Sequence, residues 1–139
     1  MYDHVLIPVD GTDESNAAIP HGIALADRFD ATAHALSVVV EGPYSLSDDE
    51  AKSEEQQAAE QAIQAVREAG EREAVPVETE LRRGIPDEEI LDYAESATVD
   101  IIVMATQRRT GLNRALEGSV TERVFRNSAI PVVTVPFEE

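Results

Sequence analysis

Cysteine and tryptophan are absent from this chain of 139 residues, and aromatic side chains are limited to three tyrosines and three phenylalanines. The absence of cysteine excludes disulfides, thiolate nucleophiles, iron–sulfur clusters and cysteine-ligated zinc sites. Hydrophobic residues still make up 42% of the chain, which is enough to build one continuous core. We therefore expect a single domain over residues 1–139 that is stabilised by packing alone.

Long apolar runs are also missing from the chain. No stretch of about 18 apolar residues occurs, and the first ten residues lack the basic and apolar regions of a signal peptide. We therefore expect a cytoplasmic protein that has no membrane partner.

Basic residues are scarce, because 11 of them stand against 28 acidic residues and leave a formal net charge of −17. Lys52 is the only lysine. This charge disfavours DNA and RNA as partners, since phosphate binding depends on clusters of Lys and Arg. Molar salt shortens the screening length to roughly 3 Å and relieves the repulsion between acidic groups. We expect a halophilic archaeal source, the alternative being an ordinary acidic protein.

Five short apolar segments alternate with segments of helical pattern. The expected strands are residues 4–9, 33–40, 77–82, 101–105 and 132–135. The expected helices are residues 13–29, 47–69 and 119–127, together with a short helix that starts near Pro86 and turns Ile90, Leu91 and Ala94 inward. We expect Pro20 to kink the first helix, Gly70 to cap the second and Pro136 to end the last strand.

This alternation predicts an α/β fold with a five-stranded parallel sheet and helices on both faces, as in Rossmann-like domains. Right-handed crossovers favour the strand order 3-2-1-4-5, with residues 77–82 at one edge. Chain direction then reverses between the first and fourth strands, and ligands of such sheets bind at that point. Two loops are thereby nominated as a binding site, Asp10-Gly11-Thr12 and residues 105–119.

The second of these loops carries residues suited to an anion. Gly118-Ser119 stands where a loop meets a helix N-terminus, and unpaired N–H groups there favour a phosphate. Three arginines lie in the same loop, and guanidinium groups pair well with phosphate. An ordinary Gly-Ser helix start and surface ion pairs are the alternatives. The three arginines are Arg108, Arg109 and Arg114.

The sequence gives less support for a metal site or a catalytic site. His4, His21 and His34 stand on separate elements without metal-ligand spacing, so we expect core, surface or strand-end roles for them. No Walker-type phosphate loop and no pair of nucleophile and base occurs at meaningful spacing. We therefore expect no metal site and no enzyme, with at most a slow, incidental ATPase activity.

The chain resembles the universal stress protein family over nearly its whole length, from Pro8-Val9-Asp10-Gly11 to Pro131-Val132-Val133-Thr134-Val135. The most specific stretch runs from Arg109-Thr110-Gly111-Leu112 to Gly118-Ser119-Val120-Thr121-Glu122-Arg123-Val124. The resemblance implies the fold of adenine nucleotide α-hydrolases, a homodimer formed through residues 132–135, and a stress response that uses ATP, ADP or AMP, with or without Mg²⁺.

In ATP-binding members the phosphate loop reads Gly, two residues, Gly, nine residues, then Gly followed by Ser or Thr. Here Ala105 and Arg108 occupy the first two glycine positions, and Gly118-Ser119 match the third. The resemblance places adenine near Val38 and Val39 and ribose near Asp10. The full set of implied nucleotide-binding residues is Pro8, Val9, Asp10, Val38, Val39, Met104, Ala105, Arg108, Gly118, Ser119, Val120 and Thr121.

Arg108 separates two functional hypotheses. A long side chain replaces a glycine whose backbone should approach the phosphates closely. If that side chain turns outward or pairs with phosphate, the protein binds an adenine nucleotide. If it obstructs the loop, the protein keeps the fold and the dimer and acts through protein–protein interaction.

We predict that folding depends on salt, because exposed like charges repel through a screened potential. The thermal unfolding midpoint should rise between low and molar KCl. A midpoint that stays level or falls across this range would remove the halophilic interpretation.

Overall fold

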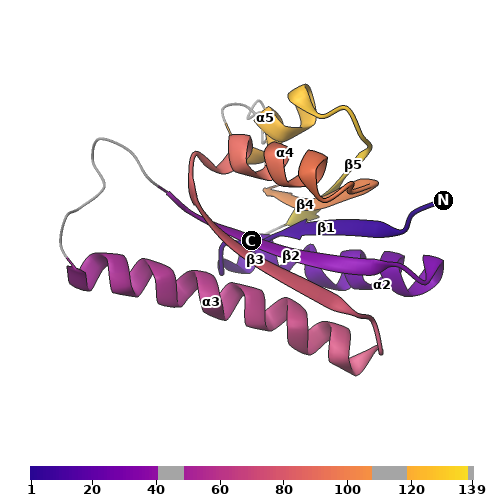
Figure 1. Cartoon of the computed structure of the whole chain (residues 1–139), viewed down its shortest axis with the longest axis horizontal. Coiled ribbons are helices and arrows are strands. Elements are labelled where there is room, and N and C mark those ends of the chain that lie inside the picture. The colour runs from indigo at the N-terminus through magenta and orange to yellow at the C-terminus, as the bar shows by residue number, and fades with distance from the viewer. Residues whose placement is uncertain (41–48, 108–118, 138–139) are drawn as a thin grey trace.

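Five parallel strands form the centre of the molecule (Figure 1). The computed structural model describes residues 1–40, 49–107 and 119–137, with no account of the side chains of residues 49–53 and 107. The sheet has the order β3-β2-β1-β4-β5, which confirms the predicted fold and topology. Its strands are β1 (His4–Pro8), β2 (Thr32–Val40), β3 (Val77–Gly84), β4 (Ile101–Gln107) and β5 (Val132–Phe137).

Helices cover both faces of this sheet. Figure 1 shows α2 and α3 below the sheet and α4 and α5 above it. The helices are α1 (Asp13–Asn16), α2 (Ile19–Phe29), α3 (Asp49–Arg72), α4 (Pro86–Ser96) and α5 (Val120–Asn127). None of the described helices is long and apolar enough to cross a membrane.

The core has two layers, one on each face of β1. Val5 and Ile7 belong to the apolar cluster shared with α2 and α3, whereas Leu6 belongs to the cluster shared with α4 and α5. Successive residues of a strand point to opposite faces, so one short apolar strand supplies both layers. Ile90 and Ala94 of α4 are buried in the second layer, as predicted, and Leu91 packs at its margin.

The first predicted helix is two helices in the structure. α1 ends at Asn16 and α2 begins at Ile19, so the expectation of one helix kinked at Pro20 was wrong. Pro20 lies in the first turn of α2. Backbone N–H groups in a first turn have no partner within the helix, so proline is tolerated there and the chain breaks before it.

The end of α3 differs from the prediction, because Gly70 lies inside the helix rather than at its cap. Ala74 takes the left-handed conformation instead, with φ 56°. The N–H of Val75 donates to the carbonyl of Gly70 at 2.8 Å and that of Ala74 to the carbonyl of Glu71 at 3.4 Å, which is a Schellman arrangement.

The last strand also runs further than predicted. β5 continues through Pro136 to Phe137, and Pro136 is paired with Thr106 of β4. β5 lies at the edge of the sheet, where a missing N–H on the outer side costs no ladder hydrogen bond.

We predict that Gly70→Ala destabilises the fold by about 1–3 kcal/mol through overpacking. A β-carbon at this position would lie 2.3 Å from Cγ2 of Val77 and 2.9 Å from the carbonyl oxygen of Val75. Urea unfolding measures the effect. Ala74→Gly is the matched control and should stabilise by about 1 kcal/mol, since glycine removes the strain of a positive φ. Equal stability of Gly70→Ala and the wild type would contradict the close packing.

Candidate functional site

The carboxyl ends of β1 and β4 bring the two predicted loops to the same edge of the sheet. β1 and β4 are neighbours, with Val5 opposite Ile101 and Leu6 opposite Ile102. From β1 the chain proceeds to β2 on one side, and β4 and β5 lie on the other side. The reversal of strand order therefore falls between β1 and β4, where open α/β sheets bind ligands.

The loop after β1 is held by a small set of hydrogen bonds. Oδ1 of Asp10 accepts from the N–H of Thr12 at 2.9 Å and from Oγ1 of Thr12 at 2.7 Å. The N–H of Asp10 donates to Oγ of Ser15 at 3.0 Å, and Oγ1 of Thr12 accepts from the N–H of Ser15 at 3.1 Å, capping α1. Gly11 between them has φ 90°. The turn thus presents the Asp10 carboxylate at the surface in one orientation.

The N-terminus of α5 is tied to the end of β4. Ser119 is the N-cap, and its Oγ accepts from the N–H of Glu122 at 3.0 Å. Oγ1 of Thr121 is buried and donates to the carbonyl of Ala105 at 2.9 Å. The hydroxyl of Thr121 therefore positions the helix, and the partial positive charge of the helix N-terminus is directed to the carboxyl edge.

The apolar residues of the predicted set lie within the strands that end at this edge. Pro8, Val9 and Val39 are buried, and the N–H of Val9 donates to the carbonyl of Leu36 at 2.8 Å. Val38 packs against the layer of α4 and α5, to which Met104 also belongs, whereas Ala105 belongs to the opposite layer.

Consecutive side chains in β2 and in β4 therefore point to opposite faces. Of Val38 and Val39, and likewise of Met104 and Ala105, only one side chain lies on a given face of the sheet. The other residue of each pair can contact a ligand on that face through its backbone. Val120 is half-buried in the first turn of α5. Arg108 and Gly118 lie outside the described residues, as do Arg109 and Arg114.

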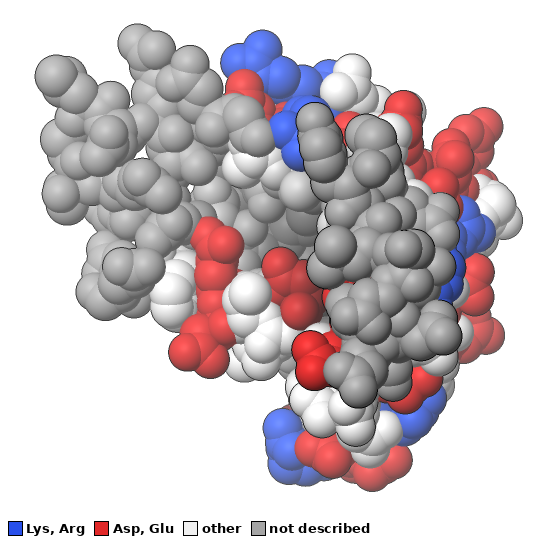
Figure 2. Space-filling model, turned by 90° about the vertical axis from the view of Figure 1, so that its left-hand side faces the viewer, with Lys and Arg blue, Asp and Glu red and all other residues white. Residues whose placement is uncertain are grey.

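Figure 2 shows the molecule from the side at which the strands end. Acidic and uncharged side chains lie in the central part of this face, between the areas drawn in grey. The basic side chains among the described residues gather toward its margins. The N-terminus of α5 carries a partial positive charge, which is suited to an anion.

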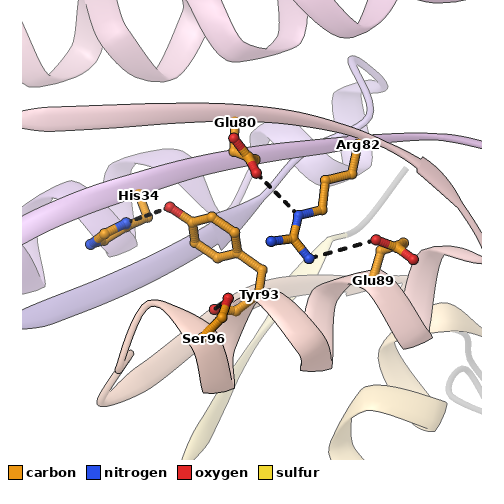
Figure 3. Close-up of polar contacts among 6 residues, drawn as sticks. All are labelled: His34, Glu80, Arg82, Glu89, Tyr93 and Ser96. Atoms are coloured by element: carbon orange, nitrogen blue, oxygen red, sulfur yellow. Dashed lines mark hydrogen bonds and ion pairs between the residues drawn. The ribbon is translucent and has the colours of Figure 1, made fainter.

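A second polar cluster was missed at the sequence level. His4 and His34 were expected to have separate roles, but Nδ1 of His4 lies 2.9 Å from Nε2 of His34. Nδ1 of His34 lies 2.7 Å from the hydroxyl of Tyr93 (Figure 3). The parallel register pairs Leu6 with His34, which places two histidines spaced far apart in sequence on one face. Register is a tertiary property, so the sequence pattern carried no signal for this contact.

Burial lowers the pKa of the His34 imidazole, with Glu78 acting in the opposite direction and His4 adding to the decrease. Burial also raises the pKa of the Tyr93 hydroxyl, and the nearby carboxylates of Glu80 and Glu78 add to the increase. The two central groups of this cluster, His34 and Tyr93, are therefore neutral at pH 7.

Comparison with known proteins places the chain in a family. The profile of the universal stress protein family matches residues 1–136. Universal stress protein MJ0531 of Methanocaldococcus jannaschii is 38% identical over 144 residues, covering 97% of this chain and 82% of that protein.

Two solved structures show the same arrangement. Universal stress protein UspA from Lactobacillus plantarum has a TM-score of 0.79 at 28% identity, covering 96% of this chain and 97% of that one. A universal stress protein in complex with cAMP has a TM-score of 0.71 at 25% identity, again covering 96% of this chain and 97% of that one. The chain belongs to the universal stress protein family.

Proposed function

We propose that this protein binds ATP or a related adenine nucleotide, ADP or AMP, at the carboxyl edge between β1 and β4, as part of a stress response. The observation that carries the proposal is the convergence of the Asp10 turn and the α5 N-terminus at the reversal of strand order. A related universal stress protein was solved with cAMP, which has the same adenosine moiety.

Each described group has a distinct role in this proposal. The α5 N-terminus with Gly118 and Ser119 faces the phosphates, because its N–H groups and its dipole favour anions. The Asp10 carboxylate accepts from ribose hydroxyls, and the backbone near Val38 and Val39 faces the adenine. Since the Thr121 hydroxyl is engaged by Ala105, Thr121 contributes its backbone N–H.

The remaining residues of the predicted set form the walls of the site. The wall residues are Pro8, Val9, Met104, Ala105 and Val120. The strands that carry or precede the first four of these residues end at this edge, and the fifth lies in the first turn of α5, so all of them lie next to the ligand in this proposal. Arg108 adds positive charge for the phosphates in this proposal.

Mg²⁺ fits this site as a companion of the nucleotide rather than as a resident metal. In residues 1–40, 49–107 and 119–137 no group of three His, Cys, Asp or Glu side chains is arranged to hold a metal. Mg²⁺ commonly binds through one or two carboxylates together with substrate phosphates. The exposed Asp10 carboxylate is the oxygen donor of the described site that suits this arrangement.

We propose that the protein is a nucleotide binder in a salt-rich cytoplasm and that any hydrolysis is slow and incidental. Oδ1 of Asp10 is engaged by both donors of Thr12, which favours a structural role for that oxygen over a role as general base. The net charge of −17 supports the salt-rich setting and argues against nucleic acid partners.

We predict that the wild type binds ATP, and binds it more tightly than adenosine, because the helix N-terminus and the arginines favour the added negative charge. Calorimetric titration in molar KCl with Mg²⁺ measures both affinities. Gly118→Val should abolish binding, since a branched side chain intrudes where the phosphates approach the backbone. If Arg108 obstructs the loop, Arg108→Gly should create or strengthen binding.

Asp10→Asn tests the described half of the site. Asparagine keeps an oxygen for the two donors of Thr12 but removes the charge, so ATP affinity should fall by about tenfold with the fold unchanged. Asp27→Asn in the last turn of α2 is the matched control and should bind like the wild type. Absence of ATP binding by both wild type and Arg108→Gly would exclude the nucleotide function and leave a role in protein–protein interaction.

We also propose that the protein is a homodimer formed through β5. This strand is an edge of the described sheet, and its residue Val133 is 39% exposed. An open strand edge with apolar side chains favours pairing with a second copy across a two-fold axis.

We predict that Val133→Asp yields monomers or insoluble chain, because a charge in the centre of the interface cannot be solvated there. Light scattering at micromolar concentration in high salt reports the mass. Ala129→Asp adds the same charge in the exposed turn before β5 and should leave the dimer intact. A monomeric wild type under these conditions would count against the interface.

A further inference from the structure

The His4, His34 and Tyr93 side chains form a continuous polar contact across three elements. His34 on β2 is 2% exposed, and both of its ring nitrogens have partners. Nε2 lies 2.9 Å from Nδ1 of His4 on β1, and Nδ1 lies 2.7 Å from the hydroxyl of Tyr93 on α4. The contact therefore joins β1 and β2 to α4, and Figure 3 shows its part between His34 and Tyr93.

Tyr93 is the residue through which α4 meets this contact. Its ring is buried, and the Arg82 guanidinium lies 5.2 Å from the ring centroid. Nε of Arg82 pairs with Oε2 of Glu80 at 3.2 Å, and its Nη1 lies 3.6 Å from Oε1 of Glu89 on α4. The Tyr93–His34 hydrogen bond is thus the buried part of a polar junction between α4 and the sheet.

The geometry of the histidine pair limits how many protons it can hold. Between Nδ1 of His4 and Nε2 of His34 there is room for one hydrogen, which either ring can donate. One additional proton leaves this hydrogen bond intact, because one ring donates and the other accepts. A second additional proton makes both nitrogens donors, and two N–H groups that face each other repel.

Charged side chains on the elements that pack against the histidine pair influence its protonation. Glu78 on β3 favours the protonated form, because its Oε2 lies 3.5 Å from Nδ1 of His34, but its side chain is 67% exposed and screened by solvent. Glu80 and Arg82 lie on the same strand near Tyr93, and they pair with each other. Asp100 accepts from the N–H groups of Asp3 and His4 at 2.8 and 2.9 Å. Burial outweighs these carboxylates and lowers the pKa of His34.

We propose that His4, His34 and Tyr93 are an acid-sensitive latch, which holds α4 on the sheet at neutral pH and loosens it in mild acid. In neutral solution the hydrogen-bond chain from His4 to Tyr93 is complete. Protonation of both histidines is compatible only with an open form, in which the contact between them is broken and His34 has left Tyr93, so acid raises the population of that open form while the closed form holds one proton. Because Nε of Arg123 on α5 pairs with Oδ1 of Asp87 on α4 at 3.1 Å, loosening of α4 also reaches the helix that begins at the carboxyl edge.

The latch has a defined effect on stability. In the unfolded chain both histidines take up a proton near their ordinary pKa of about 6.5, whereas the folded pair takes up one fewer. Stability therefore falls as the pH falls below about 6.5, until the folded pair accepts its second proton. A difference of one proton raises the unfolding equilibrium constant by about tenfold per pH unit.

The first test compares the pH dependence of unfolding between pH 6.5 and 5.5 in molar KCl. Over this pH unit the unfolding constant of the wild type should rise about fivefold more than that of His34→Gln, which has no histidine pair, because the extra proton is half taken up by the unfolded chain at its ordinary pKa of about 6.5. His21→Gln is the matched control, because it removes an exposed histidine outside the pair and should keep the pH dependence of the wild type. Equal pH dependence in wild type and His34→Gln overturns the proposal.

The second test uses the wild type and decides the question even if His34→Gln does not fold. Imidazole nitrogen NMR signals of His4 and His34 should show that the folded pair takes up one proton between pH 7 and 5.5. Hydrogen exchange, corrected for its intrinsic pH dependence, should show α4 losing at least tenfold more protection than α2 over the same range. Tyr93→Phe should reduce this difference. Uptake of a proton by each of the two histidines in the folded protein, or equal loss of protection in α2 and α4, refutes the latch.

Discussion

The burial of β1 on both faces is the constraint on which the rest of the structure depends. Val5, Leu6 and Ile7 have no exposed surface, so this strand must lie between two helical layers. Right-handed crossovers then send β2 and β3 to one side and β4 and β5 to the other. The reversal of strand order between β1 and β4 is therefore a consequence of topology, and it is the point at which open α/β sheets bind ligands.

The candidate site is built from hydrogen bonds that also serve the fold. Thr12 uses the Asp10 carboxylate to form the turn and its own hydroxyl to cap α1. The hydrogen bond from the Thr121 hydroxyl to the carbonyl of Ala105 likewise joins α5 to β4. These short local motifs orient the carboxylate and the helix N-terminus in the protein alone, so the nucleotide that we propose as ligand would not need to order them on binding.

The histidine cluster shows how a polar group can belong to an apolar layer. His34 shares its face of β2 with Leu36, and a bare imidazole there would lose its hydration without compensation. Its two ring nitrogens are satisfied by residues from β1 and α4, which are remote in sequence. Such directional contacts position α4 more specifically than apolar packing alone, and under the proposed latch they make that position dependent on protonation.

The sequence by itself determined the order of strands and helices, the two-sided burial of the sheet and the loops that form the carboxyl edge. These features depend on local patterns: apolar runs, residues that cap or break a helix, and the handedness of crossovers. Ser119 was recognisable as a helix start for that reason. The tertiary structure alone decided that Gly70 packs inside α3, that the Thr121 hydroxyl binds a carbonyl, and that His4 meets His34. Each of these depends on the register or packing of segments far apart in the chain, which local patterns do not encode.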